Sequence, residues 1–260
     1  MVVIAKHRAV VERLKLAQLA DVKRFSGDLV KDHRGRRDIF RIRATDDSGR
    51  ELVLFLKRNW KPYKKDGLAS LLKRGKVWSL SRQEWEHSLA LQRAGLNTAA
   101  LIAYGEECGP FWEKFSFILT EAATGSQTVQ EFLMQCRDRS MRRRVFDELA
   151  RTVRKMHDAG LASPDLFTRH LFVDAAAIPP TFCYIDMARL DFSKPLADRM
   201  RTRDLAALHV TAPLRFVSTR ERLQFLKVYA GEKSRELAKL IEQRAAHLLQ
   251  RRKFRDFAAD

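Results

Sequence analysis

Two aspartates in the second half of the sequence stand directly after predicted regular elements. Asp165 lies in a loop that follows a long helical pattern ended by Gly160, and Asp186 follows a short apolar strand pattern over 182–185. A carboxylate in a loop can accept or orient the proton of an attacking hydroxyl group, whereas a carboxylate also suits Mg²⁺ because this hard ion prefers oxygen ligands. The two aspartates, twenty-one residues apart, therefore predict one proton acceptor and one magnesium ligand. The alternative for Asp165 is an ordinary turn residue after a proline.

A lysine and a glutamate in the first half stand where a phosphate-binding pair would be needed. Lys57 is the last residue of a predicted strand over 51–57, and Glu84 lies at the start of the one helix predicted in this half. In kinases a strand lysine pairs with the α- and β-phosphates of the nucleotide, and a helix glutamate holds that lysine by an ion pair. Each residue also has a plainer interpretation: a strand-end lysine whose charge reaches water, and a carboxylate that closes a capping box with Ser81.

His170 stands five residues after Asp165, where the kinase catalytic-loop motif has an asparagine that binds a second metal ion. A neutral imidazole is a poor ligand for Mg²⁺, so a hydrogen bond to Asp165 or to a phosphate is the alternative role. Each of these five matches is weak by itself. Their order along the chain and their expected local structures favour phosphoryl transfer.

The elements that position these residues change character near the middle of the chain. Strand patterns separated by turns rich in Asp, Ser and Gly precede residue 119, and helical patterns dominate after it. The predicted strands are 29–30, 38–43, 51–57, 101–104 and 115–119, of which the first three form an antiparallel meander. Helices are predicted over 81–95, 130–134 and 141–159 and from 199 onward, with a short strand pair at 170–173 and 182–185.

This order predicts an α+β protein-kinase-like bilobal fold, with a β-rich N-lobe and a helical C-lobe. Architecture alone is weak support for a function, so the polar residues above carry that part of the prediction. The predicted parts are an N-terminal amphipathic helix or arm over 1–20, the N-lobe over 21–119, a hinge over 120–126 and the C-lobe over 127–260.

The composition excludes several classes of protein. The 260 residues include 50 Lys and Arg against 32 Asp and Glu, a formal net charge of +18. A hydrophobic fraction of 45% supports a folded core and excludes intrinsic disorder, and no apolar run approaches the ~20 residues of a membrane-spanning helix. Charges near the start argue against a secretory signal, and three widely spaced cysteines suit a reducing compartment. We therefore expect a cytoplasmic protein.

Eight short stretches together resemble the bacterial lipopolysaccharide kinases, which phosphorylate Kdo or heptose of the inner core. The resemblance runs from about Gly27 to Tyr229, and its most specific parts are His170 and the four-residue spacing that begins at Asp186 and ends at Arg189. It implies ATP and Mg²⁺ as cofactors and an acidic, lipid-linked sugar as acceptor. The stretches are 54–58, 82–85, 94–98, 103–107, 117–121, 156–160, 165–170 and 185–189.

The resemblance also implies a role for each candidate residue. Glu121 and Gly35 are assigned to the nucleotide site, where Gly35 and the arginines beside it would cover the phosphates in place of a GxGxxG loop. The other roles are a catalytic aspartate, a nucleotide-positioning pair, a magnesium ligand and a second-metal position, held by Asp165, by Lys57 with Glu84, by Asp186 and by His170.

One departure from the kinase pattern leaves an alternative function open. Ser163 and Pro164 replace the His-Arg that precedes the catalytic aspartate in kinases, and the lost His normally braces the metal loop. The rival is a pseudokinase that binds nucleotide or serves as a scaffold without turnover, and a kinase for another small molecule is a further alternative. No nucleic-acid partner is expected, because the basic residues do not surround a known nucleic-acid motif.

The surplus of positive charge gathers in two segments, 58–76 and 137–155. A kinase needs positive potential for ATP, but not this much. Anionic lipid headgroups attract basic side chains by about 1 kcal/mol each. We therefore expect an anionic membrane surface as a partner, with the protein docked peripherally on the cytoplasmic face of the inner membrane.

Overall fold

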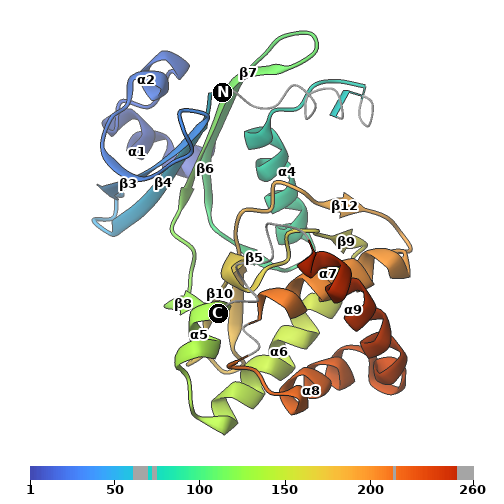
Figure 1. Cartoon of the computed structure of the whole chain (residues 1–260). Coiled ribbons are helices and arrows are strands. Elements are labelled where there is room, and N and C mark those ends of the chain that lie inside the picture. The colour runs from blue at the N-terminus through green and yellow to red at the C-terminus, as the bar shows by residue number, and fades with distance from the viewer. Residues whose placement is uncertain (61–69, 72–74, 213–214, 251–260) are drawn as a thin grey trace. The chain divides into compact units, whose positions relative to one another are not determined.

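The computed structural model describes the 260-residue chain except for residues 61–69, 72–74, 213–214 and 251–260 (Figure 1). The chain divides into two compact units. Unit 1 comprises Met1–Leu89 and Ala99–Ala122, and unit 2 comprises Ala90–Thr98 and Ala123–Asp260. The segment Ala90–Thr98 thus groups with unit 2, whereas the sequence patterns predict one unbroken N-lobe over 21–119.

Unit 1 is built on a six-stranded sheet with the order β1-β6-β7-β4-β3-β2, in which every pairing is antiparallel (Figure 1). The predicted three-strand meander is confirmed as β2, β3 and β4, and the two later predicted strands are β6 and β7. The strands are β1 (Val2–Val3), β2 (Asp28–Asp32), β3 (Arg37–Thr45), β4 (Glu51–Asn59), β6 (Leu101–Cys108) and β7 (Glu113–Glu121).

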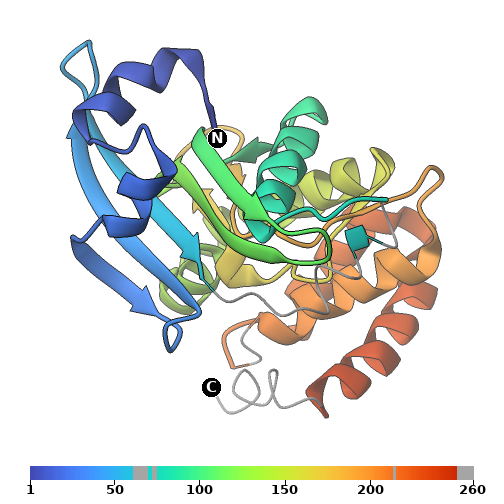
Figure 2. The same ribbon diagram turned by 90° about the horizontal axis from the view of Figure 1, so that it is seen from above.

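Short helices cover one face of this sheet. In place of one amphipathic helix over 1–20, the chain forms β1, a 3₁₀ turn, α1 (Arg8–Arg13) and α2 (Leu19–Arg24). Val10 and Val22, at most 1% exposed, pack into a core with Leu54 and Leu56 of β4. Figure 2 shows α1 and α2, in dark blue, lying against the blue strands.

Helix α4 (Leu80–Arg93) packs on the other face of the sheet. Trp85 of α4 joins Tyr104 and Ile118 in a second, smaller core. Because side chains alternate between the faces of a strand, Leu56 points toward the core under α1 and α2 and Lys57 toward the α4 side. Strand periodicity therefore brings Lys57 to the helix that carries Glu84.

Unit 2 contains one continuous helical core. The predicted helix over 141–159 is confirmed as part of α6, in which Val145, Leu149, Val153 and Met156 are all at most 3% exposed. A capping box formed by Ser218 and Glu221 begins α8. The helices are α5 (Val129–Gln135), α6 (Arg139–Asp158), α7 (Asp198–Thr211), α8 (Thr219–Ala230) and α9 (Ser234–Leu249).

Two small sheets in unit 2 hold the loops of interest. One has the order β5-β11-β10-β8, and the other pairs β12 with β9. The loop over 163–170 runs from β9 to β10, and the loop over 185–190 runs from β11 to β12. Because β9 pairs with β12 and β10 with β11, both ends of the two loops are held side by side. The strands are β5 (Asn97–Thr98), β8 (Gln127–Thr128), β9 (Leu161–Ala162), β10 (Leu171–Asp174), β11 (Thr181–Tyr184) and β12 (Asp191–Phe192).

A search of the described residues found no helix with both the length and the apolar character that crossing a membrane requires.

Candidate active site

Lys57 and Glu84 form an ion pair inside unit 1. The Lys57 Nζ lies 2.6 Å from Glu84 Oε1, and the two side chains are only 14% and 9% exposed. Lys57 is opposite Ile118 and Ile39 in the sheet, so it is fixed from both neighbouring strands. A pair this far from water is weakly screened, and the loss of either partner would remove a short contact between opposite charges.

The capping role considered for Glu84 is wrong. Helix α4 begins at Leu80, and its cap is the Ser79 hydroxyl, which accepts the backbone N–H of Arg82 at 3.0 Å. Ser81, the expected cap, lies inside the helix and instead accepts a hydrogen bond from the Ser116 hydroxyl at 2.8 Å. Glu84 therefore lies beyond the helix start, where its carboxylate pairs with Lys57.

Glu121 and Gly35 lie elsewhere in unit 1. Among the described residues Glu121 pairs with Arg50 at 3.2 Å and approaches His7 at 3.9 Å, not Lys57 or Glu84. Gly35 is in the turn between β2 and β3 with φ +68°, and a Cβ there would meet nothing within 4 Å. Its N–H donates to Asp32 Oδ1 at 2.9 Å. The nucleotide-site role of both residues stays a prediction.

In unit 2 the Asp165 carboxylate is engaged by Arg189. The guanidinium donates from Nε to Oδ2 and from Nη2 to Oδ1, a two-pronged contact between the two paired loops. The Asp165 side chain is 13% exposed and that of Arg189 is 58% exposed. The family resemblance includes Arg189, but no sequence pattern predicts its contact with Asp165.

His170 lies against the same loop with a defined tautomer. Its Nδ1 is 2.9 Å from the backbone carbonyl of Asp165, and because a carbonyl only accepts, Nδ1 carries the proton. Burial lowers the pKa of His170, although the carbonyl of Asp165 and the charge of Asp186 act in the opposite direction. A neutral ring protonated at Nδ1 has an acceptor lone pair at Nε2, which faces the Nε–H of Arg169 at 3.4 Å.

Asp186 is in the left-handed backbone region, with φ +56°. Aspartate tolerates this region better than most residues, and backbone strain of this kind clusters at functional sites. The residue before it, Ile185, donates its N–H to the His170 carbonyl at 2.9 Å. Unit 2 thus brings Asp165, His170 and Asp186 into two adjoining loops.

Ser163 links these two loops. Its hydroxyl donates to the backbone carbonyl of Arg189 at 3.1 Å and accepts the Asp165 N–H at 3.3 Å. Ser163 therefore ties the Asp165 loop to the Asp186 loop by a hydrogen bond.

Asp204 of α7 anchors the same segment and is a positioning residue; the family resemblance includes it in the stretch Arg203-Asp204-Leu205 but predicts no contact for it. It is 0% exposed, and its carboxylate accepts the Ser163 N–H and the Arg203 Nε–H, with His157 Nε2 at 3.4 Å. An acidic residue beside the apolar run 205–208 was the available signal, because buried carboxylates are rare unless they are paired.

Across the described ranges, no cluster of three or more His, Cys, Asp or Glu side chains is arranged to hold a metal ion. Such a cage is not required for Mg²⁺, which is usually bound by one or two carboxylates together with substrate phosphates. The carboxylate of Asp186 fits that kind of site as an oxygen ligand.

The sequence of the chain is similar to those of known kinases. The sequence profile of the lipopolysaccharide kinase (Kdo/WaaP) family matches residues 20–229. The chain is 31% identical over 165 residues to the lipopolysaccharide core heptose(I) kinase WaaP of Pseudomonas aeruginosa, a match that covers 60% of this chain and 62% of that protein. It is 26% identical over 232 residues to WaaP of Escherichia coli K12, covering 85% and 84% of the two chains.

A solved structure described as WaaP in complex with acyl carrier protein superposes with a TM-score of 0.68 at 25% identity, covering 95% of this chain and 99% of that one. This likeness confirms the predicted kinase-like fold, with a β-rich N-terminal region and a helical C-terminal region. Together with the profile match over most of the sequence, it means that the chain belongs to the lipopolysaccharide kinase (Kdo/WaaP) family.

Proposed function

We propose that the protein is an ATP-dependent kinase that phosphorylates a sugar hydroxyl of the lipopolysaccharide inner core. The family and the names of its relatives, which are heptose(I) kinases, support this activity and favour heptose over Kdo as the acceptor sugar. The observation that carries the proposal is the pair of adjoining loops that hold Asp165, His170 and Asp186 in unit 2. The predicted lobe bounds, 21–119 and 127–260 with a hinge over 120–126, belong to the same proposal.

In the proposed reaction the acceptor hydroxyl oxygen forms a bond to the γ-phosphorus of ATP while the bond to the ADP oxygen breaks. Asp165 accepts the hydroxyl proton, and the Lys57–Glu84 pair positions the nucleotide phosphates. Bound Mg²⁺, held by Asp186 and the phosphates, would neutralise charge on the phosphate oxygens. His170 would accept a hydrogen bond at Nε2 or occupy the second-metal position.

The test compares the wild type with Asp165→Asn and Asp186→Asn in phosphate transfer from ATP to an inner-core acceptor. Removal of a general base is expected to lower kcat by about 10²–10⁴-fold. Asp198→Asn is the matched control, because Asp198 is exposed at the start of α7 in the same unit, and it should retain wild-type activity. Unchanged rates in both site variants would refute the assignment. Tight nucleotide binding without phosphate transfer to any acceptor would favour the alternative, a pseudokinase, which is suggested by Ser163 and Pro164.

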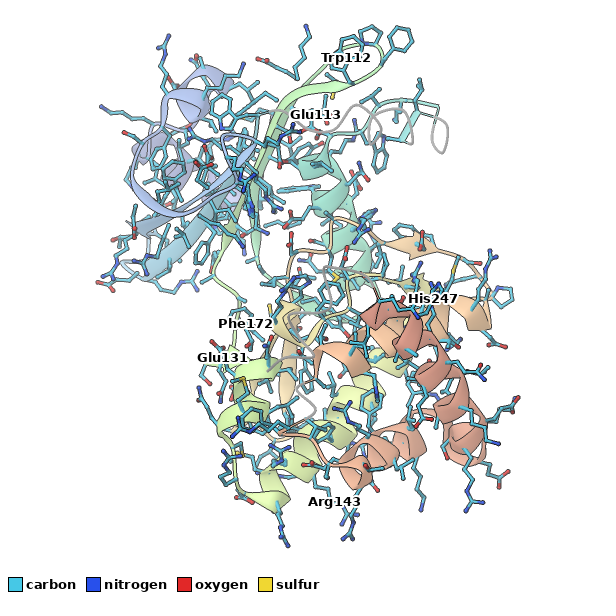
Figure 3. All side chains as sticks on the ribbon, in the orientation of Figure 1. Trp112, Glu113, Glu131, Arg143, Phe172 and His247 are labelled. Carbon is cyan, nitrogen blue, oxygen red and sulfur yellow. The ribbon has the colours of Figure 1, made fainter. Side chains whose placement is uncertain are left out.

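We also infer that the protein docks on anionic membrane lipid through a basic cleft of unit 2. The cleft measures about 900 Å³ and lies where α6 begins and the chain enters α8. Figure 3 shows Arg143 at this end of α6, where its side chain is 74% exposed. We call this the arginine cleft. Its arginines are Arg137, Arg139, Arg142, Arg143, Arg215 and Arg220.

Among the residues that the structure describes, only one of these arginines has a close ion-pair partner. Arg142 is buried and pairs with Glu221 at 2.6 Å, and Arg143 lies 4.0 Å from Asp147. The positive charge of the others remains available to an anionic headgroup. Lys61, Lys64 and Lys65, which the sequence also favours for docking, lie outside the described residues.

The docking assay is sedimentation with phosphatidylglycerol vesicles. The triple variant Arg139→Gln, Arg143→Gln and Arg220→Gln should weaken binding by about a hundredfold, since each basic side chain contributes about 1 kcal/mol. An equal loss of charge at the exposed start of α9, by Lys233→Gln at its N-cap and by Arg235→Gln and Lys239→Gln within it, is the control and should have a smaller effect. Equal losses in both triple variants would contradict a localised docking site.

A further inference from the structure

Arg189 carries more hydrogen-bonding capacity than its contact with Asp165 uses. A guanidinium has five N–H donors, and the two-pronged contact with the carboxylate takes one from Nε and one from Nη2. Both donors of Nη1 and the second donor of Nη2 remain. In the part of the chain that the structure describes, these donors have no acceptor, and the Arg189 side chain is 58% exposed.

The position of this cation is fixed from two sides. The backbone carbonyl of Arg189 accepts the Ser163 hydroxyl at 3.1 Å, and two residues later the chain enters β12, which pairs with β9. At the other end of the side chain, Asp165 holds the guanidinium in one plane. A guanidinium fixed in this way is pre-organised for a second planar or tetrahedral oxyanion, because little side-chain entropy is left to lose.

Stability does not explain the arrangement. An exposed ion pair contributes about 0–1 kcal/mol, and the Asp165 loop is already held by backbone hydrogen bonds, from Leu166 to Ser163 and from Phe167 to Asp165. A cation placed directly on the proposed catalytic carboxylate also reduces the charge repulsion that an anionic ligand would otherwise meet there. The contact is therefore best explained by what binds next to Asp165.

We propose that Arg189 is an acceptor-recognition residue, whose remaining donors bind a carboxylate or phosphate substituent of the sugar acceptor. This inference rests on the proposed kinase function. Because Arg189 and Asp165 are in direct contact, the anionic group and the hydroxyl that Asp165 deprotonates must be close neighbours in one saccharide. The substrate class is then an anionic saccharide rather than a neutral one, and Arg189 discriminates between them.

Kinetics with matched acceptors test the proposal. Wild type and Arg189→Gln are assayed with an inner-core acceptor that carries Kdo carboxylates, with its carboxyl methyl ester and with its dephosphorylated form. Loss of a charge-assisted hydrogen bond should lower kcat/KM for the intact acceptor by about tenfold or more. With the acceptor form that lacks the recognised anion, kcat/KM of Arg189→Gln should be close to that of the wild type. The KM of the variant for ATP should stay within about twofold of the wild-type value. The acceptor on which the difference disappears identifies carboxylate or phosphate as the ligand.

A control variant and the pattern of losses across acceptors separate recognition from positioning. Arg199→Gln removes an exposed arginine from the first turn of α7 and should behave as wild type with every acceptor. Equal losses of kcat with all three acceptors in Arg189→Gln would mean that Arg189 only holds Asp165, and this result overturns the proposal.

A binding measurement keeps the inference testable if no acceptor is phosphorylated. The ¹⁵N resonance of Arg189 Nε, identified by its absence in Arg189→Gln, is followed while free Kdo or its methyl ester is added to the full chain. A shift with the acid and not with the ester supports a carboxylate site, and inorganic phosphate is added in a parallel titration. Two results overturn the proposal. In the first, neither Kdo nor phosphate shifts the resonance. In the second, the acid and the ester shift it equally and phosphate does not shift it. Failure of turnover alone would count against the kinase function, not against this site.

Discussion

Replacing the Asp204 carboxylate by an amide is expected to destabilise unit 2 strongly. Asp204 is 0% exposed, and its carboxylate accepts hydrogen bonds from the Ser163 N–H and the Arg203 Nε–H. Asp204→Asn keeps the size of the side chain, but it removes one of two carboxylates that pair with Arg203, the other being Asp191 at 2.8 Å, and it can place an amide NH₂ against the Ser163 N–H. A buried N–H left without its acceptor costs about 1–3 kcal/mol. For a chain of this length that corresponds to a Tm decrease of about 2–12 °C.

Thermal unfolding followed by circular dichroism measures this effect, with Asp198→Asn as the control in the same helix. Asp198 is exposed, so its replacement should change stability by less than about 0.5 kcal/mol. Hydrogen exchange of the Ser163 amide gives a local readout, since Asp204 is the acceptor of that N–H. If Asp204→Asn unfolds at the wild-type temperature and the Ser163 amide remains equally protected, the reasoning about this buried network is refuted.

Three further predictions concern the nucleotide pair, pH and the loop brace. Lys57→Met and Glu84→Gln should each lower kcat/KM for ATP by about 10²-fold or more, with a smaller effect on the KM for the sugar. The reason is that the two side chains are largely buried and their charged atoms lie 2.6 Å apart. Wild-type kinetics in both variants would contradict this prediction. Burial, followed by the charge of Arg222, lowers the pKa of His209 to about 4, so the unfolded chain binds this proton more readily. The contribution of neutral His209 to the free energy of unfolding is complete above pH ~6.5 and falls as the pH drops toward 4. In urea unfolding, the free energy of unfolding of His209→Gln should therefore decline less over this pH range than that of the wild type. Ser163→Ala removes the hydroxyl that bridges the loops and should lower kcat about tenfold at a cost in stability of about 1 kcal/mol; an unchanged kcat would show that the brace is dispensable.

Local sequence patterns determined most of the elements. Alternating apolar residues identified the β2–β4 meander and set Lys57 on the face opposite Leu56, because the strand period of two is a property of the backbone. The apolar spacing of α6 from Val145 to Met156 likewise followed from the helical period. The family resemblance, carried by short motifs that include Asp165 and Asp186, was also readable without coordinates.

The start of α4 shows where local signals are insufficient. Ser81 and Glu84 have the spacing of a capping box, but Ser79 caps the helix instead. The Leu80 N–H donates to Glu113 at 2.9 Å, and the Ser81 hydroxyl is engaged by Ser116. These partners come from β7 and are more than thirty positions away in the sequence. Tertiary contacts therefore determine that Ser79, and not Ser81, caps the helix.

The order of elements, the family and the residue types suited to phosphoryl transfer could all be predicted from the sequence. The contact of Asp165 with Arg189, twenty-four positions away, and that of Asp204 with Ser163, across forty-one positions, could be found only in the folded chain. The physical reason is range. Periodicity and capping act over a few residues, whereas an ion pair between loops depends on two strand pairs, β9 with β12 and β10 with β11, that close only when unit 2 folds.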